Sequence, residues 1–121
     1  MSHLFAFEKL QVWQEARVLL KMIYLVTNSY PKSEIFGITS QMRRAALSIS
    51  SNFAEGSGRT SKKDQAHFYQ MSYSSELELL NQLILSQDLG YISGEQYNEV
   101  RLKIESLTNK TNSLRKRCLG V

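Results

Sequence analysis

The chain of 121 residues is long enough for one domain with one hydrophobic core. Its apolar content of 42% excludes an intrinsically disordered protein, and no apolar run approaches the ~20 residues that a membrane-spanning helix needs. The net charge is +4, and the basic excess lies near the C-terminus, because residues 101–117 contain six basic residues and one acidic residue.

Helix start and stop signals divide the chain into four segments. The first predicted helix ends at the turn that closes with Pro31, and Thr39 is expected to cap the second, which runs to the glycines at positions 56 and 58. Capping-box sequences at Ser61 and Ser93 start the third and fourth helices, and Gly90 lies where a glycine would end the third. We predict helices over about residues 9–29, 39–56, 61–89 and 93–118.

Short links between long helices favour antiparallel neighbours. The chain shows no alternating apolar pattern typical of a strand, and no internal repeat. The sequence therefore predicts an all-α fold, an antiparallel up-down-up-down four-helix bundle that forms one domain over residues 1–121.

The four helices differ in the width of their apolar faces. The second and fourth have narrow faces, whereas the faces of the first and third cover roughly 160° and 180°, more than the 100° or so that a monomeric bundle needs. On the first helix, Val18, Met22 and Leu25 fall outside even this arc. Exposed apolar surplus of this kind indicates an interface, so we expect the chain to form a homo-oligomer.

The second helix carries small residues where large ones are usual, within QMRRAALSISSNFAEGSGR, residues 41–59. Small side chains allow neighbouring backbones to approach closely. Polar side chains follow one line along this helix, and we interpret them either as a solvated face or as a polar seam at a helix or subunit boundary. The line contains Gln41, Arg44, Ser48, Asn52 and Glu55.

One acidic residue is expected inside the core. Glu76 lies within the apolar arc of the third helix, and a buried carboxylate needs a partner because an unpaired buried charge costs several kcal/mol. Arg43 and Arg44 lie at a compatible height on the second helix, so we predict that Glu76 pairs with one of them as part of the polar seam.

No catalytic, metal or cofactor site is predicted. Asp64-x-x-His67 supplies only one half of the paired motifs that a di-iron bundle needs. The seven residues between Arg59 and His67 miss the spacing of four to six found in helical-bundle ribonucleases, and Gly56-Ser57-Gly58-Arg59 lacks the strand and the Lys-Ser/Thr of a P-loop. We expect no enzymatic activity.

Several motifs resemble those of the four-helix-bundle proteins encoded by intervening sequences in 23S ribosomal RNA genes. The resemblance covers about residues 5 to 115, with small departures at Ile38 and Phe53. Its central motif is Gln41-Met42-Arg43-Arg44-Ala45-Ala46, Ser48-Ile49, Asn52-Phe53-Ala54-Glu55-Gly56 and Gly58-Arg59, and further matches are Leu10, Val12-Trp13-Gln14, Ala16, Pro31, Glu34, Phe36-Gly37, Ser75-Glu76-Leu77 and Gly90-Tyr91.

The resemblance carries expectations about fold and partners. It implies an antiparallel four-helix bundle that assembles as a homopentamer, without an established enzymatic activity. The chain is also similar to the accessory protein of diversity-generating retroelements, a basic pentamer that works with a reverse transcriptase and nucleic acid, so a reverse-transcriptase-like or other protein is a candidate partner.

The predicted topology gathers basic residues at one end of the bundle, where the link between the second and third helices meets the C-terminus of the fourth. Such a cluster favours nucleic-acid backbones, so RNA or DNA is the candidate ligand. The alternative is an oligomeric scaffold or adaptor for a protein partner, without nucleic-acid binding. The residues proposed for the nucleic-acid site are Arg59, Lys62, Lys63, Lys110, Arg115, Lys116 and Arg117.

The N-terminus and the single cysteine indicate the compartment. The first ten residues lack the basic segment and apolar core of a signal peptide, and Cys118 cannot form an internal disulfide. Both features fit a reducing environment, so we expect a cytoplasmic protein with no membrane partner.

Overall fold

Four α-helices make up most of the computed structural model, which describes residues 3–121, and this part of the chain contains no strand. Each helix begins and ends within two residues of the positions predicted from the sequence. Two short 3-10 turns precede α1 and α2. In chain order the elements are η1 (Ala6–Lys9), α1 (Gln11–Thr27), η2 (Lys32–Glu34), α2 (Ile38–Ser57), α3 (Lys62–Asp88) and α4 (Gly94–Leu119).

Three of the predicted helix-end signals are confirmed and one is wrong. The hydroxyls of Ser61 and Ser93 accept hydrogen bonds from the backbone N–H groups three residues later, at 3.0 and 3.1 Å. Gly90 follows α3 with a φ of 76°, a conformation that favours glycine. Thr39, however, is not the N-cap of α2, because Gly37 holds that position and the Thr39 side chain is buried.

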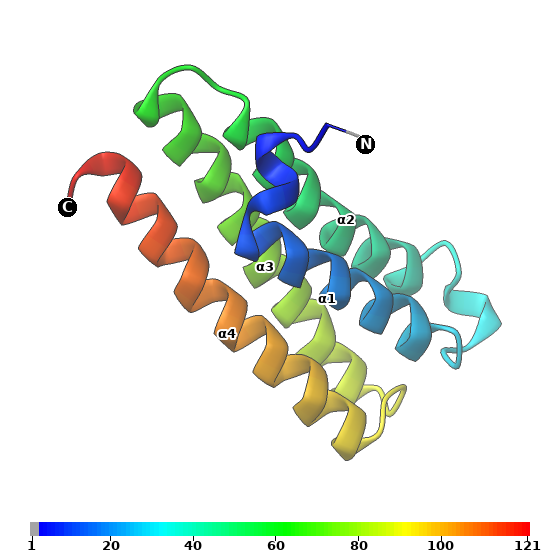
Figure 1. The fold of residues 1–121 in the computed structure, drawn as a ribbon. Coiled ribbons are helices and arrows are strands. Elements are labelled where there is room, and N and C mark those ends of the chain that lie inside the picture. Colours follow the sequence, from blue (N-terminus) through cyan, green and yellow to red (C-terminus); the bar gives the residue numbers. More distant parts are fainter. Residues whose placement is uncertain (1–2) are drawn as a thin grey trace.

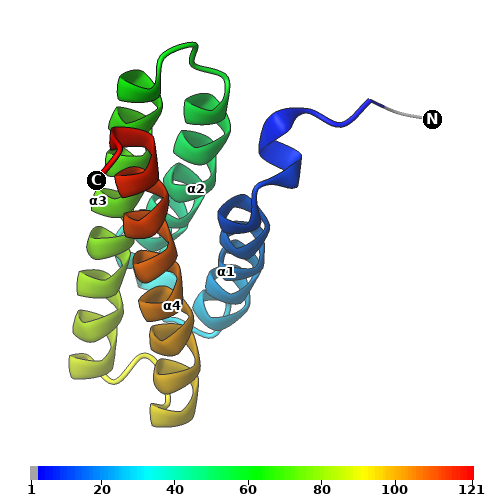
Figure 2. The ribbon, with the colours of Figure 1, turned by 60° about the vertical axis from the view of Figure 1, so that its left-hand side comes forward.

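The helices pack side by side as a four-helix bundle (Figures 1 and 2). The α2–α3 connection lies at the same end as the C-terminus of α4, and the other two connections lie at the opposite end. Hydrogen bonds between helices agree with this arrangement: Ser72 on α3 bonds Ile49 on α2, whereas Ser86, later on α3, lies 3.5 Å from the sulfur of Met42, earlier on α2.

Small residues bring α2 and α3 into close contact, as the sequence predicted. The Ser72 hydroxyl donates a 2.8 Å hydrogen bond to the backbone carbonyl of Ile49, so a side chain of one helix reaches the main chain of the next. Closer to the α2–α3 turn, a methyl group at Gly56 would lie only 2.8 Å from Cβ of Phe68 and from Cε1 of Tyr69. Only glycine leaves room for this approach.

The buried faces follow the predicted periodicities. The narrow apolar face of α2 (Met42, Ala45, Ala46, Ile49 and Phe53) is fully buried, and that of α4 is buried from Tyr97 to Thr111. Some apolar side chains of α1 and α3 stay exposed: Leu25, outside the wide face of α1, is 71% exposed, and Leu77 of α3 is 46% exposed.

No helix within residues 3–121 is long and apolar enough to cross a membrane.

Replacing Gly56 with alanine should destabilise the fold, although alanine favours a helix more than glycine does. The added methyl would press on Cβ of Phe68, which cannot move without the α3 backbone. We expect a loss of about 1–3 kcal/mol in the free energy of unfolding, measured by urea denaturation.

Gly94→Ala is the matched control. Position 94 lies in the first turn of α4, and no atom lies within 4 Å of the added methyl, so this variant should be as stable as the parent or slightly more stable. Equal stability of both variants would contradict the close α2–α3 approach.

Candidate functional site

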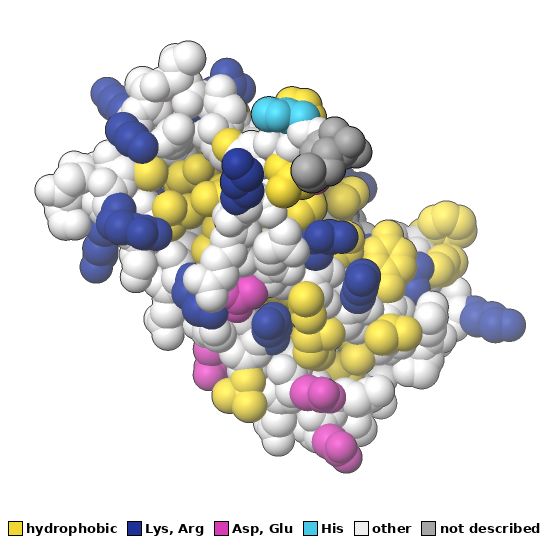
Figure 3. All heavy atoms as spheres, viewed as in Figure 1, with side chains coloured by type: hydrophobic (Ala, Val, Ile, Leu, Met, Phe, Trp, Pro, Cys, Tyr) yellow, Lys and Arg dark blue, Asp and Glu magenta, His cyan; other side chains and the backbone are white. Residues whose placement is uncertain are grey.

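Six of the seven proposed nucleic-acid-binding residues gather at one end of the molecule. Arg59 lies in the turn after α2, Lys62 and Lys63 begin α3, and the other three lie in the last turns of α4. Gln65 joins these elements, because its amide donates to the carbonyl of Arg59 at 3.0 Å and its side-chain oxygen lies 3.9 Å from the sulfur of Cys118. Basic side chains crowd this end of the space-filling view (Figure 3).

The basic side chains at this end form no ion pairs within residues 3–121. None of Arg59, Lys62, Lys63, Arg115, Lys116 and Arg117 forms an ion pair with another residue of the described chain. We call these six residues the basic end. Excess positive charge of this kind attracts polyanions, and the attraction weakens as salt is added.

Lys110 is held differently. Its amino group pairs with a Glu15 carboxylate oxygen at 2.6 Å, and Lys103 lies 3.7 Å from the other oxygen of the same carboxylate. Glu15 therefore neutralises part of the positive charge along α4 and joins α4 to α1, so Lys110 is less available to a phosphate than the basic end is.

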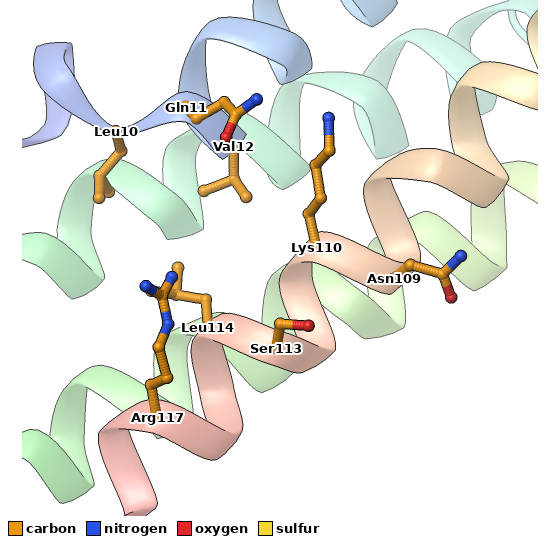
Figure 4. A pocket seen from close by; sticks show the side chains of 8 residues that line it. All are labelled: Leu10, Gln11, Val12, Asn109, Lys110, Ser113, Leu114 and Arg117. Carbon is orange, nitrogen blue, oxygen red and sulfur yellow. The ribbon is translucent and has the colours of Figure 1, made fainter.

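A shallow groove of about 230 Å³ continues from the basic end between α1 and α4 (Figure 4). Its apolar lining comes from the start of α1 and from Leu114, while the side chains of Lys110 and Arg117 extend toward α1. The groove is lined by Leu10, Gln11, Val12, Asn109, Lys110, Ser113, Leu114 and Arg117.

Acidic residues lie at the opposite end. The Tyr91 hydroxyl donates a 2.8 Å hydrogen bond to Glu34, and this bond raises the pKa of Tyr91 because it stabilises the protonated phenol. Asp88, Glu95 and Glu99 are exposed there. Exposed acidic residues are therefore more frequent at the end opposite the basic end.

The predicted polar seam along α2 is divided between two environments. The Asn52 amide donates to the carbonyl and the hydroxyl of Ser48 at 3.0 and 3.2 Å, and the Ser75 hydroxyl of α3 bonds the same Ser48 hydroxyl at 3.0 Å. Gln41, Arg44 and Glu55 are exposed, and thus form a solvated face.

The predicted pairing of Glu76 with Arg43 or Arg44 is wrong. Arg43 instead donates to the Thr27 hydroxyl at 3.0 Å and to the Asn28 side-chain oxygen at 3.2 Å. Its guanidinium also lies over the ring of Tyr24, 4.5 Å from the centroid. Arg43 therefore ties α2 to the C-terminal end of α1 rather than to the core of α3.

The burial of Glu76 is confirmed, but its partner is a hydroxyl. The side chain is fully buried, and one carboxyl oxygen lies 2.8 Å from the Thr111 hydroxyl, which also lies 2.8 Å from the carbonyl of Leu107. A threonine hydroxyl carries one proton. If that proton goes to the Leu107 carbonyl, the carboxyl group must supply the proton for the second hydrogen bond.

The environment favours this neutral form of Glu76. Burial raises the pKa of the Glu76 carboxyl to about 8, and this effect exceeds the opposite effect of a hydrogen bond donated by the Thr111 hydroxyl to the charged form. The other carboxyl oxygen has no hydrogen-bond partner within the described chain, which a neutral acid tolerates better than a carboxylate. Thr111 follows Leu107 by four residues on the buried face of α4, and this spacing was a signal in the sequence for the partner of Glu76.

Residues 3–121 contain no group of three or more His, Cys, Asp or Glu side chains that could hold a metal ion. His67 is exposed, and its ring meets that of Phe68 edge to face. Cys118 is half-buried beside Gln65.

The fold and the central motif define a class of small helical-bundle proteins. The family model for the 23S rRNA-intervening sequence protein matches residues 8–113. The chain belongs to this family.

A solved structure has a similar fold. It is the crystal structure of a protein of unknown function from the S23 ribosomal protein family of Bacteroides thetaiotaomicron, with a TM-score of 0.79 and 20% sequence identity. The similarity covers 87% of this chain and 98% of the other. No curated protein matches the chain.

The Glu76 carboxyl should make stability depend on pH. Its pKa is higher in the folded chain, about 8, than in the unfolded chain, so the folded state holds an extra proton between pH 5 and pH 8. Stability is therefore greatest at the acidic side of this window and falls as pH rises. Glu76→Gln removes the titrating group. The difference in free energy of unfolding between this variant and the parent should therefore shift by about 3 kcal/mol in favour of the variant as the pH rises from 5 to 8.

Chemical denaturation of both proteins across this pH range measures the difference. Glu78→Gln is the control, because Glu78 is exposed on the same helix and its replacement should leave the pH dependence unchanged. A parent and a Glu76→Gln variant with parallel pH profiles would show that Glu76 does not hold the extra proton.

Proposed function

We propose that the chain is an antiparallel, up-down-up-down four-helix bundle that works as a non-enzymatic, cytoplasmic homo-oligomer and binds RNA or DNA through its basic end. The observation that carries the proposal is the clustering of six cations without acidic partners. Phosphate groups are the anions that such a surface suits, since each contact releases a counterion and needs no particular base.

Exposed apolar side chains support self-association. Leu25 on α1 is 71% exposed and Leu102 on α4 is 65% exposed, and Val18 is also exposed on α1. Between α1 and α4 lies a second groove, which includes Met22 and Val100. A neighbouring copy would cover these side chains, and the resemblance to pentameric bundles gives five copies. A ring of this kind would multiply the charge of the basic end.

The second candidate function is an oligomeric scaffold for a protein partner. It is favoured by apolar side chains at the acidic end, where Phe36 is 93% exposed and Ile35 and Leu89 are also exposed. A reverse-transcriptase-like protein is one such partner suggested by resemblance. In this case the basic end would contribute only to solubility and to helix-end electrostatics.

Replacing Lys62, Lys63 and Lys116 together with glutamine should weaken binding to any nucleic-acid sequence. Each lost phosphate contact should reduce the slope of log affinity against log salt by about 0.9 on duplex DNA, or about 0.7 on a single strand. Fluorescence anisotropy at several salt concentrations measures both quantities.

The control for this variant is the replacement of Glu95 and Glu99 with glutamine at the opposite end, which should not weaken binding. If the parent protein binds neither RNA nor DNA at low salt, the nucleic-acid proposal fails and the scaffold function takes its place.

Placing a charge on the exposed apolar face of α1 should break the oligomer. Leu25→Glu puts a carboxylate where a neighbouring copy would otherwise bury leucine, and light scattering should show a smaller species than the parent. Gln41→Glu adds the same acid at an exposed position on the polar face of α2 and should leave the mass unchanged. A parent protein that is monomeric at micromolar concentration would overturn the assembly.

A further inference from the structure

Two arginines of the basic end lie against aromatic rings of α3. The guanidinium carbon of Arg59 lies 4.4 Å from the ring centroid of Phe68, and that of Arg115 lies 5.9 Å from the ring centroid of Tyr73. The exposed ring of His67 meets Phe68 edge to face, with centroids 5.8 Å apart. The first half of α3 therefore combines positive charge with flat aromatic surfaces.

These groups lie on both sides of the exposed face of α3. Phe68 and Tyr73 are five residues apart, so the shorter arc between them, about 140°, is the buried side of α3 with Tyr69 and Ser72, and the exposed side spans about 220°. The turn after α2 reaches one edge of this exposed side, and α4 reaches the other. Lys63 and His67 are exposed on the face between them. No acidic residue of the described chain pairs with either arginine, so both guanidinium groups keep their charge for a ligand.

Attraction to phosphates requires positive charge but does not require planar side chains. A guanidinium plane and an aromatic ring offer faces on which a base can stack, and stacking platforms beside cations are typical of proteins that bind single strands. The bases of a duplex are already stacked on one another and paired, so their faces cannot reach such a surface. The flat groups therefore add affinity only for unpaired nucleotides.

We infer that the face of α3 formed by Arg59, Phe68, His67, Tyr73 and Arg115 binds single-stranded nucleic acid by stacking unpaired bases, in addition to phosphate contacts. This inference rests on the proposed nucleic-acid binding of the basic end. It adds a preference for single strands and a set of residues that the charge pattern alone does not identify.

Substitution of both arginines by lysine tests the inference, because lysine keeps the positive charge but lacks the planar guanidinium group on which a base can stack. Arg59→Lys with Arg115→Lys should reduce affinity for an RNA or DNA strand of about 20 nucleotides by about tenfold. The affinity for a duplex of the same length should change less than twofold. Arg44→Lys is the control, since Arg44 is exposed on α2, outside the basic end, and lies over no aromatic ring of the described chain.

A strand with abasic sites separates stacking from charge in the parent protein. It keeps the phosphates and lacks the bases, so the parent should bind it about tenfold more weakly than the intact strand, as the double variant binds the intact strand. Thermal denaturation verifies that each variant is folded. A reduced affinity for intact RNA alone, or for intact DNA alone, supports the inference and identifies the ligand.

Three outcomes would overturn the inference. If the parent binds the intact and abasic strands equally, or if the double variant loses affinity equally for duplex and single strand, charge alone explains binding and the proposed function survives without stacking. If the parent binds no nucleic acid at low salt, both the inference and the proposed function fail.

Discussion

The close approach of α2 and α3 is the constraint on which the rest of the structure depends. Ser72 reaches the Ile49 carbonyl, and Gly56 admits Phe68 and Tyr69 at the end of the contact. Because these helices lie so near each other, their connecting turn is short and places Arg59 against Phe68. The small residues of α2 thus determine both the packing of the core and the position of the basic end.

A neutral carboxylic acid in the core follows from the same packing. With α2 occupied by Ala45, Ala46 and Ile49, the polar partner for Glu76 comes from α4, where Thr111 interrupts an apolar seam. A hydroxyl costs less to bury than a guanidinium, since it carries no charge to desolvate. Arg43, one of the two predicted partners, instead joins the C-terminal end of α1 to α2, where solvent still reaches it.

Local patterns were sufficient to predict much of the fold, whereas particular partners were not. Helix ends and buried faces depend on neighbouring residues in sequence, and so Ser61, Ser93 and Gly90 marked them correctly. The partner of Glu76 depends on how helices are rotated about their axes, which periodicity fixes only within a broad arc. The same limit applies to Lys110, whose pairing with Glu15 joins residues far apart in the chain.

The packing of α1 against the other helices should allow α1 to unfold locally more easily than α2 or α3. Two grooves separate parts of α1 from α4, and apolar side chains such as Leu25 face outward rather than into the core. Since α1 contacts its neighbours less extensively than α2 and α3 contact each other, we expect a lower free energy of local unfolding for α1, and the amide hydrogens of α1 in an isolated chain should exchange with solvent faster than those of α2 and α3. A neighbouring copy that covered α1 would slow this exchange, because assembly would stabilise the helix that forms the interface.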